Sequence, residues 1–405
     1  MANSALEYFC DSLGNVVLRD ENGNPSIFVR HPKQKSSEFD ASLPEHTHPA
    51  FIVNNVEDPA VLIGKYMASE LAANGTLYSL PNMPARTSRS FEQFLGAMQA
   101  ACSGAGGMTI ADHGLIVLMA HKAGWTSHGN TNYGADISAG TRYELNKSVS
   151  VGDVRIFRGW EYTCLIAHTT AETLLPVNAP AYWQKGRQVG GTPDMNSLGT
   201  AAQNYQTYRM LTGSGPLDWN FLDDVCLEAD IVGNAYETVY GFRLVNCEIQ
   251  IIPDNNAADP SCDQSAESSA WRAIKPHAND DGHDLVAPGT SGTVHYNWLD
   301  SKITLDTVVP NFDDVSRVTK LTEVAVNETN LPHVPAILYE LGLAPLPGTT
   351  VDGEIQLKFS QGELIARRGG NSGSATHAGV GLLYITTGRA GAGTYGARLR
   401  ARTNA

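Results

Sequence analysis

The chain has little of what a membrane protein, a dithiol redox site or a secreted precursor needs. No apolar run approaches the roughly 18 residues that cross a bilayer, and no two cysteines form a CxxC pair. The N-terminus, MANSALEYFCDSLG, lacks a basic region followed by an apolar stretch, so no secretion signal is expected. The chain is therefore not expected to insert into membranes. Any position outside a cell would be reached by another route, such as assembly into a particle.

Positive charge is scarce. Asp and Glu number 42 against 28 Lys and Arg, which gives a net charge of −14. Because phosphate groups repel such a surface, nucleic acid is not an expected partner. The 405 residues are 42% hydrophobic, which is enough for one large core or two smaller ones.

Cysteine is sparse and scattered, at Cys10, Cys102, Cys164, Cys226, Cys247 and Cys262. Free thiols in a protein made in a reducing cytosol are the favoured interpretation. A disulfide between Cys247 and either Cys226 or Cys262 is the alternative that the spacing leaves open.

The C-terminal segment lacks Asp, Glu and Lys altogether after Glu363. Residues 367–402 hold nine Gly and six Arg, with apolar residues recurring among them: Val380, Leu382, Leu383, Ile385, Tyr395 and Leu399. A disordered tail would lack such anchors. The segment is therefore predicted to be folded between two fixed ends, RGG at 368–370 and GAR at 396–398. A frayed, flexible end is the alternative.

Two helices are predicted from their start signals. Ser90 and Gln93 form a capping box ahead of a helical apolar face, and Gly104 is the expected end. Thr109 opens the second helix with Asp112, and Gly124 closes it.

Short strands dominate elsewhere, so the predicted fold class is α+β with few helices, short strands and long loops. The expected strands span 15–19, 26–30, 60–66, 154–157, 164–167, 241–245, 248–252, 293–297, 302–305 and 354–359. Residues 253–292 are rich in Pro, Asp and Ser and are expected to form a loop region.

Several motifs in order resemble the formylglycine-generating-enzyme-like branch of the C-type lectin fold. They are VLIGKYMASE (61–70), SFEQFLGAMQAAC (90–102), GGMTIADHG (106–114), GNTNYG (129–134), DIVGNAYETVYG (230–241), and the terminal pair RRGG and YGAR. Gly233, Asn234 and Glu237 keep the family's pattern, whereas Tyr236 replaces its first Trp and His113 stands where another Trp is usual. The resemblance covers roughly residue 55 to the end and implies that fold.

Within this branch, the C-terminal segment is most similar to the variable proteins of diversity-generating retroelements. In that family a reverse transcriptase rewrites template adenines, so selected positions vary on a fixed scaffold. The resemblance implies a ligand-binding surface at Asn371, Ser372, Ser374, Thr376, His377, Gly381, Tyr384, Thr386, Thr387, Gly391 and Gly393. Their polar or small side chains are expected to face solvent, while the apolar anchors between them pack inward. The segment is one residue shorter than the family pattern before Gly396.

Enzyme chemistry and metal binding are not expected. The related oxidases bind copper through a Cys pair just after RGG, and this chain has no Cys beyond Cys262. His46 and His48 are the closest His pair, and solvated surface side chains are the favoured interpretation. Asp254, Asn256 and Asp259 lie in an acidic loop that could hold Ca²⁺, although a set of Asx turns is favoured.

These observations predict a small β-rich segment at 1–55 and a C-type lectin-like domain at 56–405. That domain carries an insertion around 255–350 and a variable region at 367–402. The expected function is a non-enzymatic display protein on a virion surface or cell exterior that binds a host cell-surface protein or other receptor. A homo-oligomer is left open. The alternatives are a relative of the formylglycine-generating oxidases and a structural virion protein without a variable site.

Overall fold

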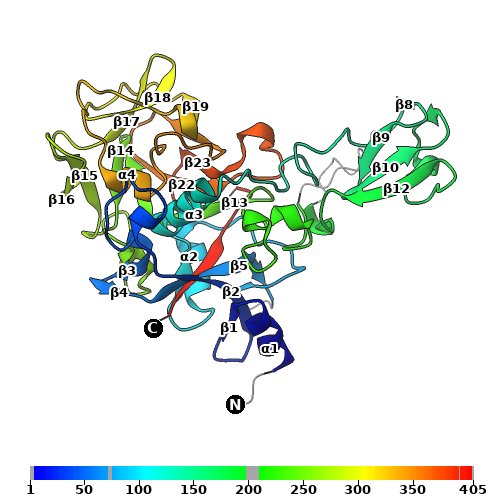
Figure 1. Ribbon diagram of the computed structural model, residues 1–405, viewed down its shortest axis with the longest axis horizontal. Coiled ribbons are helices and arrows are strands. Elements are labelled where there is room, and N and C mark those ends of the chain that lie inside the picture. The colour runs from blue at the N-terminus through cyan, green and yellow to red at the C-terminus, as the bar shows by residue number, and fades with distance from the viewer. Residues whose placement is uncertain (1–3, 72–74, 198–208, 392, 404–405) are drawn as a thin grey trace.

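The computed structural model describes residues 4–71, 75–197, 209–391 and 393–403. The fold is mixed α+β, mostly strands with few helices and several antiparallel sheets, as the fold class predicted (Figure 1). None of the helices in this part of the chain has the length and apolar character that crossing a bilayer requires.

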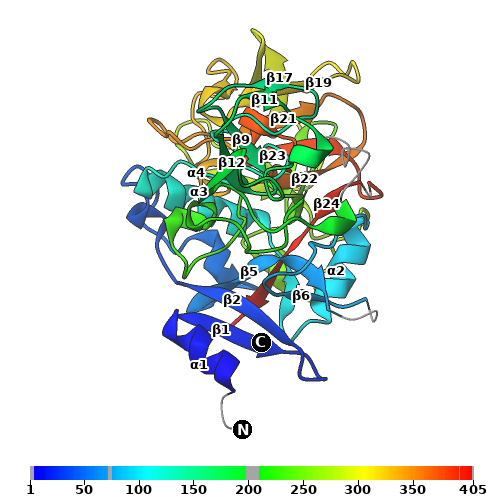
Figure 2. The same ribbon diagram turned by 90° about the vertical axis from the view of Figure 1, so that its right-hand side faces the viewer.

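The first sheet brings the two ends of the chain together. Its strand order is β1 (Asn15–Arg19), β2 (Pro25–Pro32), β5 (Ala60–Glu70), β25 (Arg398–Arg402) and β7 (Ala105–Gly107), with β6 (Leu77–Ser79) beside β5. Figure 2 shows these strands at the lower end of the molecule. Because β2 pairs with β5, the sheet crosses the boundary that the sequence placed near residue 55.

The second sheet carries the C-terminal segment. Its path is β19 (Ser316–Lys320), β21 (Glu354–Lys358), β23 (Gly379–Thr387), β22 (Glu363–Gly369), β13 (Tyr236–Val245), β14 (Glu248–Ile251), β17 (His295–Leu299), β18 (Lys302–Asp306) and β20 (Ala325–Val326). Beside this path lie β15 (Arg272–Pro276), β16 (His283–Val286) and β24 (Tyr395–Gly396). The sheet is mainly antiparallel, but β23 runs parallel to β21, and β24 runs parallel to β13.

The strands of the expected insertion are part of this sheet. Residues 253–292 are not a pure loop region as predicted, because β15 pairs with β14 and with β16. These two strands were not predicted because the residues around them are rich in Pro, Asp and Ser, which are typical of loops. Most other predicted strands are found within two residues of their predicted ends, whereas β5 and β13 are longer.

Four α-helices lie in the described ranges: α1 (Ala5–Ser12), α2 (Phe91–Gln99), α3 (Ile110–Ala123) and α4 (Ala336–Glu340). Both predicted capping boxes are present, with Ser90 and Gln93 on α2 and with Thr109 and Asp112 on α3. Gly124 ends α3 at a φ of 60°, as predicted. Helix α2 ends at Gln99 rather than near Gly104 as predicted, because the chain must turn into β7. The largest hydrophobic cluster lies between α3 and the second sheet.

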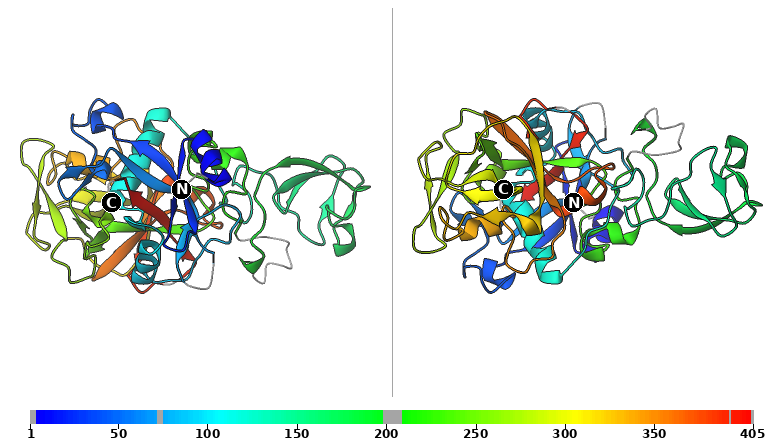
Figure 3. Two further views of the ribbon diagram at one scale, coloured as in Figure 1. Left: turned by 90° about the horizontal axis from the view of Figure 1, so that it is seen from below. Right: turned by 90° about the horizontal axis from the view of Figure 1, so that it is seen from above.

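A separate lobe projects from the body (Figures 1 and 3). It contains β8 (Ser148–Val149), β9 (Val154–Phe157), β10 (Trp160–Cys164), β11 (His168–Thr169) and β12 (Trp183–Gln188) around its own small core. The predicted strand at 164–167 is wrong, because β10 ends at Cys164 and the apolar Leu165 and Ile166 are exposed. A short hairpin, β3 (Ile52–Val53) and β4 (Val56–Glu57), completes the strands.

Candidate ligand-binding surface

One buried carboxylate holds both ends of the C-terminal segment. Glu237 on β13 accepts a hydrogen bond from Arg368 Nη1 at Oε2 and one from Arg398 Nε at Oε1, each at 2.8 Å. All three side chains are buried in the core. Arg368 belongs to RGG and Arg398 to GAR, so the two predicted fixed ends meet on one residue. Residues 369–391 and 393–397, the described part of the segment, therefore lie between two ends that are held together, as predicted for an ordered segment.

The remaining donors of Arg398 are used by backbone carbonyls. They reach the carbonyl oxygens of Gly64, Lys65, Ala229 and Asp230 at 2.9 to 3.1 Å. This set of acceptors matches the fixed fork of the guanidinium group, which has five N–H donors. Arg398 therefore joins β25 to β5 and to the 229–230 turn.

Two further buried arginines, Arg368 and Arg400, lie against α3. Arg368 Nε lies 3.3 Å from His113 Nδ1, and Arg400 Nε lies 3.3 Å from Asp112 Oδ2. Burial, and then the charge of Arg368, hold the pKa of His113 well below its usual value, so this imidazole is neutral and its Nδ1 accepts. Arginine on the C-terminal segment thus has a structural role rather than forming a basic patch.

The other motifs behind the family resemblance also meet in the core. Asn234 Oδ1 accepts from Asn130 Nδ2 at 3.1 Å and from the Met210 N–H at 2.8 Å. Gly233 has a φ of 79°, and a Cβ there would lie 2.4 Å from the Asn130 carbonyl oxygen. The 129–134 and 230–241 motifs therefore form one packed unit whose glycine has no room for a side chain.

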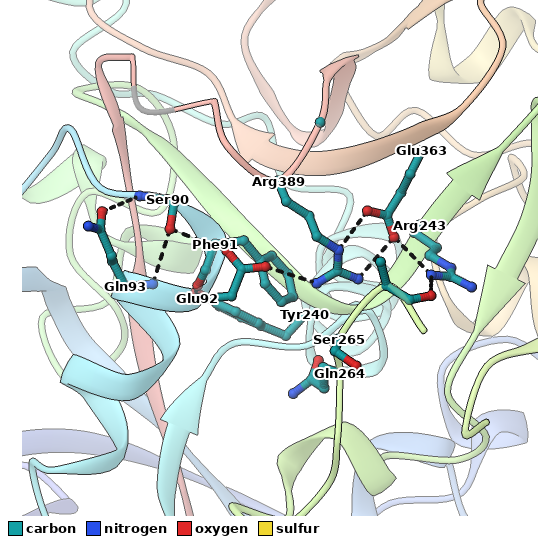
Figure 4. A network of polar contacts seen from close by, with 12 residues as sticks. Ser90, Phe91, Glu92, Gln93, Tyr240, Arg243, Gln264, Ser265, Glu363 and Arg389 are labelled. Carbon is teal, nitrogen blue, oxygen red and sulfur yellow. Dashed lines mark hydrogen bonds and ion pairs between the residues drawn. The ribbon is translucent and has the colours of Figure 1, made fainter. Parts of the chain in front are cut away.

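A second tether holds the turn that follows β23. Arg389 Nε donates to Glu363 Oε2 at 2.6 Å, and Glu363 Oε1 accepts from Arg243 Nη1 at 2.9 Å. The Arg389 guanidinium lies over the Phe91 ring, and the Arg389 carbonyl accepts the Phe91 N–H at 3.1 Å. Figure 4 shows Arg389 between Glu363 and Glu92 at the start of α2. The segment is therefore fixed at its middle as well as at its ends.

The apolar anchors are buried as predicted, except Tyr395, which is half-buried. Val380, Leu382, Leu383 and Ile385 on β23 are at most 2% exposed. Leu383 lies opposite Ile355 of β21 and Arg368 of β22, on the face that packs against the core.

Eight of the eleven predicted surface positions are exposed or half-buried, and three are buried. Thr376, His377 and Gly393 are exposed, and Asn371, Tyr384, Thr386, Thr387 and Gly391 are half-buried. Three predictions are wrong, because Ser372, Ser374 and Gly381 are buried.

Contacts with residues elsewhere in the chain explain why Gly381 and Ser374 are buried. A Cβ at Gly381 would lie 2.5 Å from Leu321 Cδ2 and 3.1 Å from the Asp352 carbonyl oxygen. Ser374 Oγ accepts the Asn371 N–H at 2.9 Å and contacts the Tyr236 hydroxyl at 3.2 Å. Ser374 shapes the turn before β23 and Gly381 lets β23 pack closely, so both positions belong to the scaffold.

An aromatic cluster extends the surface beyond the C-terminal segment. The Tyr236 ring centroid lies 4.8 Å from that of Tyr384 and 6.1 Å from that of Tyr395. All three tyrosines are half-buried, and the Arg367 guanidinium lies 3.8 Å from the Tyr395 centroid. Burial raises the pKa of both Tyr236 and Tyr395, so their hydroxyls stay protonated at neutral pH. Tyr236 was not predicted as part of this surface, although neighbouring residues of a strand face opposite sides and its neighbour Glu237 keeps the family's pattern.

Two further contacts support the exposed side chains. His377 Nδ1 contacts Glu354 Oε2 on β21, and Thr387 Oγ1 accepts from Arg367 Nη1 at 2.6 Å. Fixed residues of neighbouring strands therefore orient two of the predicted surface positions.

The metal candidates have other uses in the fold. Asn256 Oδ1 accepts the Asn54 N–H, and Asp259 Oδ2 accepts from Asn54 Nδ2, each at 2.6 Å. Asp259 Oδ1 also accepts the Ser261 N–H at 2.9 Å, which is an Asx turn. Burial raises the pKa of Asp254, and the charge of His46 acts in the opposite direction. Across the described ranges, no group of three or more His, Cys, Asp or Glu side chains could hold a metal ion.

His46 is exposed, as expected of a surface side chain, whereas His48 is not. His46 Nε2 lies 2.5 Å from Glu340 Oε1, and His48 Nε2 lies 2.9 Å from the Glu340 carbonyl oxygen. His48 is fully buried, so the pair fastens the 44–49 segment to α4. The cysteines are all free, as favoured from the sequence, with Cys226 and Cys262 partly exposed and the other four buried.

Comparison with known families finds none that the chain matches, and a search of curated proteins finds no similar sequence.

Proposed function

We propose that this chain is a non-enzymatic ligand-binding display protein with a C-type lectin fold, of the kind diversified by retroelements. One observation carries the proposal. A single buried carboxylate, Glu237, fixes Arg368 and Arg398 at the two ends of a segment whose middle exposes Thr376 and His377. Residues that hold the fold are thereby separated from residues that touch solvent, which a diversifiable surface requires. The meeting of Asn130 with Asn234 adds support for the fold assignment.

The proposed binding surface combines variable and fixed side chains. Its centre is the tyrosine cluster of Tyr236, Tyr384 and Tyr395, and its rim includes His377 with Glu354. Tyrosine offers a large amphipathic contact area at a low entropy cost, which suits recognition of a protein surface. The proposed ligand is a host cell-surface protein or other receptor, contacted from a virus or phage particle. Each site binds weakly, and multivalent display raises the avidity by roughly 10² to 10⁴.

The two alternatives make different demands on the chain. An oxidase of the formylglycine-generating type needs a thiolate pair after the RGG segment, and no Cys follows Cys262. A structural virion protein without a variable site has no reason to expose Thr376 and His377 on a segment that is fixed at both ends. The exposed side chains therefore favour the display surface over both.

Two matched libraries test this proposal. One randomises the surface positions Asn371, Thr376, His377, Tyr384 and Thr386. The other randomises the buried positions Ser372, Ser374 and Gly381. Both are displayed on phage and panned against a purified test protein, such as lysozyme.

The proposal expects most clones of the first library to resist protease and to yield binders. The second library should lose protease resistance in most clones, because its positions belong to the scaffold. Equal loss of resistance in both libraries, or no binders from the first, would contradict the display surface.

A further inference from the structure

Three arginine side chains gather around an open groove beside the C-terminal segment. Arg86 and Arg209 line a pocket of ≈ 670 Å³, and Arg86 and Arg89 line a neighbouring one of ≈ 530 Å³. The two pockets adjoin, since Arg86 and Ser88 line both. The Ser88 N–H donates to the Tyr395 carbonyl at 3.2 Å, which places the groove next to β24. Its size is that of ordinary ligand sites.

The groove carries more positive than negative charge. Arg86 and Arg89 share the carboxylate oxygen Glu70 Oε2, each at 3.4 Å, and Arg209 Nε lies 3.6 Å from Asp194. Three guanidinium groups thus share two carboxylates. Their N···O distances, 3.4 to 3.6 Å, are longer than those of good charged hydrogen bonds. Burial, and then the charge of Arg86, lower the pKa of Arg89, so the cations crowd one another. This local excess stands out in a chain whose net charge is −14.

The residues that line the groove have mostly small or polar side chains. One wall is the face of α2 that carries Gly96, Ala97 and Ala100, and a Cβ at Gly96 would meet no atom within 4 Å. Among the described lining residues, Leu71 is the one large apolar side chain. Hydroxyl and amide groups complete the lining, from Thr87, Ser88, Gln93 and Asn196. Such a lining suits an extended hydrophilic ligand rather than one anchored by apolar side chains.

We propose that this groove binds an acidic peptide segment of a partner protein, with peptide carboxylates at Arg86 and Arg209. The guanidinium fork matches a carboxylate, and the hydroxyl and amide side chains can pair with peptide N–H and C=O groups. A nucleic acid backbone offers no N–H donors to the hydroxyl and amide side chains of the groove, so an acidic peptide matches this lining better. The site goes beyond the proposed display surface and does not depend on variation at residues 371–393.

Fluorescence anisotropy of the full chain with a labelled hexaglutamate peptide tests this site. Hexaglutamine serves as the neutral peptide, and a sulfated hexasaccharide and inorganic sulfate serve as other anions. Two variants remove the groove's function by different means. Arg86→Ala removes a guanidinium that is 45% exposed, and Gly96→Leu fills open space on a helix that a leucine favours. The matched control is Arg187→Ala on β12, whose side chain is 68% exposed and pairs with Glu161 at 3.1 Å.

The expected result is binding of hexaglutamate but not of hexaglutamine, weakened as salt rises. Arg86→Ala should lower the affinity roughly tenfold or more, the effect of losing a charged hydrogen bond. Gly96→Leu should lower it as well, because its side chain would occupy the groove, while the control leaves it unchanged. The melting temperature of Gly96→Leu should not fall, so lost binding cannot come from unfolding. The proposal is overturned if hexaglutamate does not bind, or binds all variants equally. Tighter binding of the hexasaccharide or of sulfate at Arg86 would overturn the peptide assignment.

Discussion

Replacing Glu237 by Gln should be among the most damaging substitutions in this chain. Gln keeps the shape of Glu but not its charge, and its amide N–H donors would point at guanidinium donors. Arg368 and Arg398, both 0% exposed, would then lie in the core without their common anion. Removing one partner of a buried ion pair costs about 3 to 5 kcal/mol. Since a domain has about 5 to 15 kcal/mol of stability in all, Glu237→Gln is expected to lose a large share of it.

Urea unfolding, followed by tryptophan fluorescence, measures this loss. The matched control is Glu57→Gln, because Glu57 pairs with Lys33 at 2.9 Å on the surface, where such pairs are worth about 1 kcal/mol or less. Trypsin provides a second readout, since cleavage at Arg389 and Arg398 should be slow in the native protein and fast in Glu237→Gln. A loss below about 1 kcal/mol, equal to that of the control, would refute the reasoning. The two arginines would then not depend on this carboxylate.

Three further predictions follow from burial and charge. Leu383→Ala should cost about 2 to 5 kcal/mol in urea unfolding, whereas Thr376→Ala should change stability by less than about 0.5 kcal/mol; similar values would contradict the division into anchors and surface. Gly381→Ala should lower the melting temperature because its Cβ would lie 2.5 Å from Leu321, whereas Gly393→Ala, whose nearest atoms are in the flexible Tyr395 ring at 3.2 Å, should not. Burial raises the pKa of Asp230 to about 6, so this carboxyl favours the folded state at low pH and loses that contribution as pH rises from about 4 to 6. Asp230→Asn should therefore stabilise the protein at neutral pH by about 3 kcal/mol, with the gain shrinking toward pH 4; a pH-independent difference would contradict the assignment.

Local chemistry made two of the four α-helices in the described ranges, α2 and α3, and many strands predictable. The capping boxes at Ser90 and Thr109 act within one helical turn, so four residues of sequence are enough to find each start. Gly124 and the apolar anchors of β23 were found for the same reason, since both depend on short-range conformation or alternation. The end of α2 was missed because β7 pairs with β25, almost 300 residues further along the chain.

The buried arginines could not be predicted from composition. Arg is mostly exposed in proteins. Arg398 can be fully buried because Glu237, far away in the sequence, offsets the cost of desolvating its charge. Ser374 illustrates the same limit, because its burial depends on the Tyr236 hydroxyl, 138 residues away. The lobe around Trp183 was also missed, since its short strands and turns have no strong periodicity. The sequence was therefore enough to find the segment that carries the candidate site. The structure was needed to tell which of its residues hold the fold and which face solvent.

The most direct test of the display surface is the natural variation of the gene's 3′ coding end. Sequencing many copies from the population that carries it should show substitutions at Thr376, His377 and Tyr384. Glu237, Arg368 and Arg398 should not vary, and a reverse-transcriptase gene with a template repeat should lie nearby. Uniform sequences across the segment with no such gene, or variation at the buried arginines as frequent as at the exposed positions, would contradict the account.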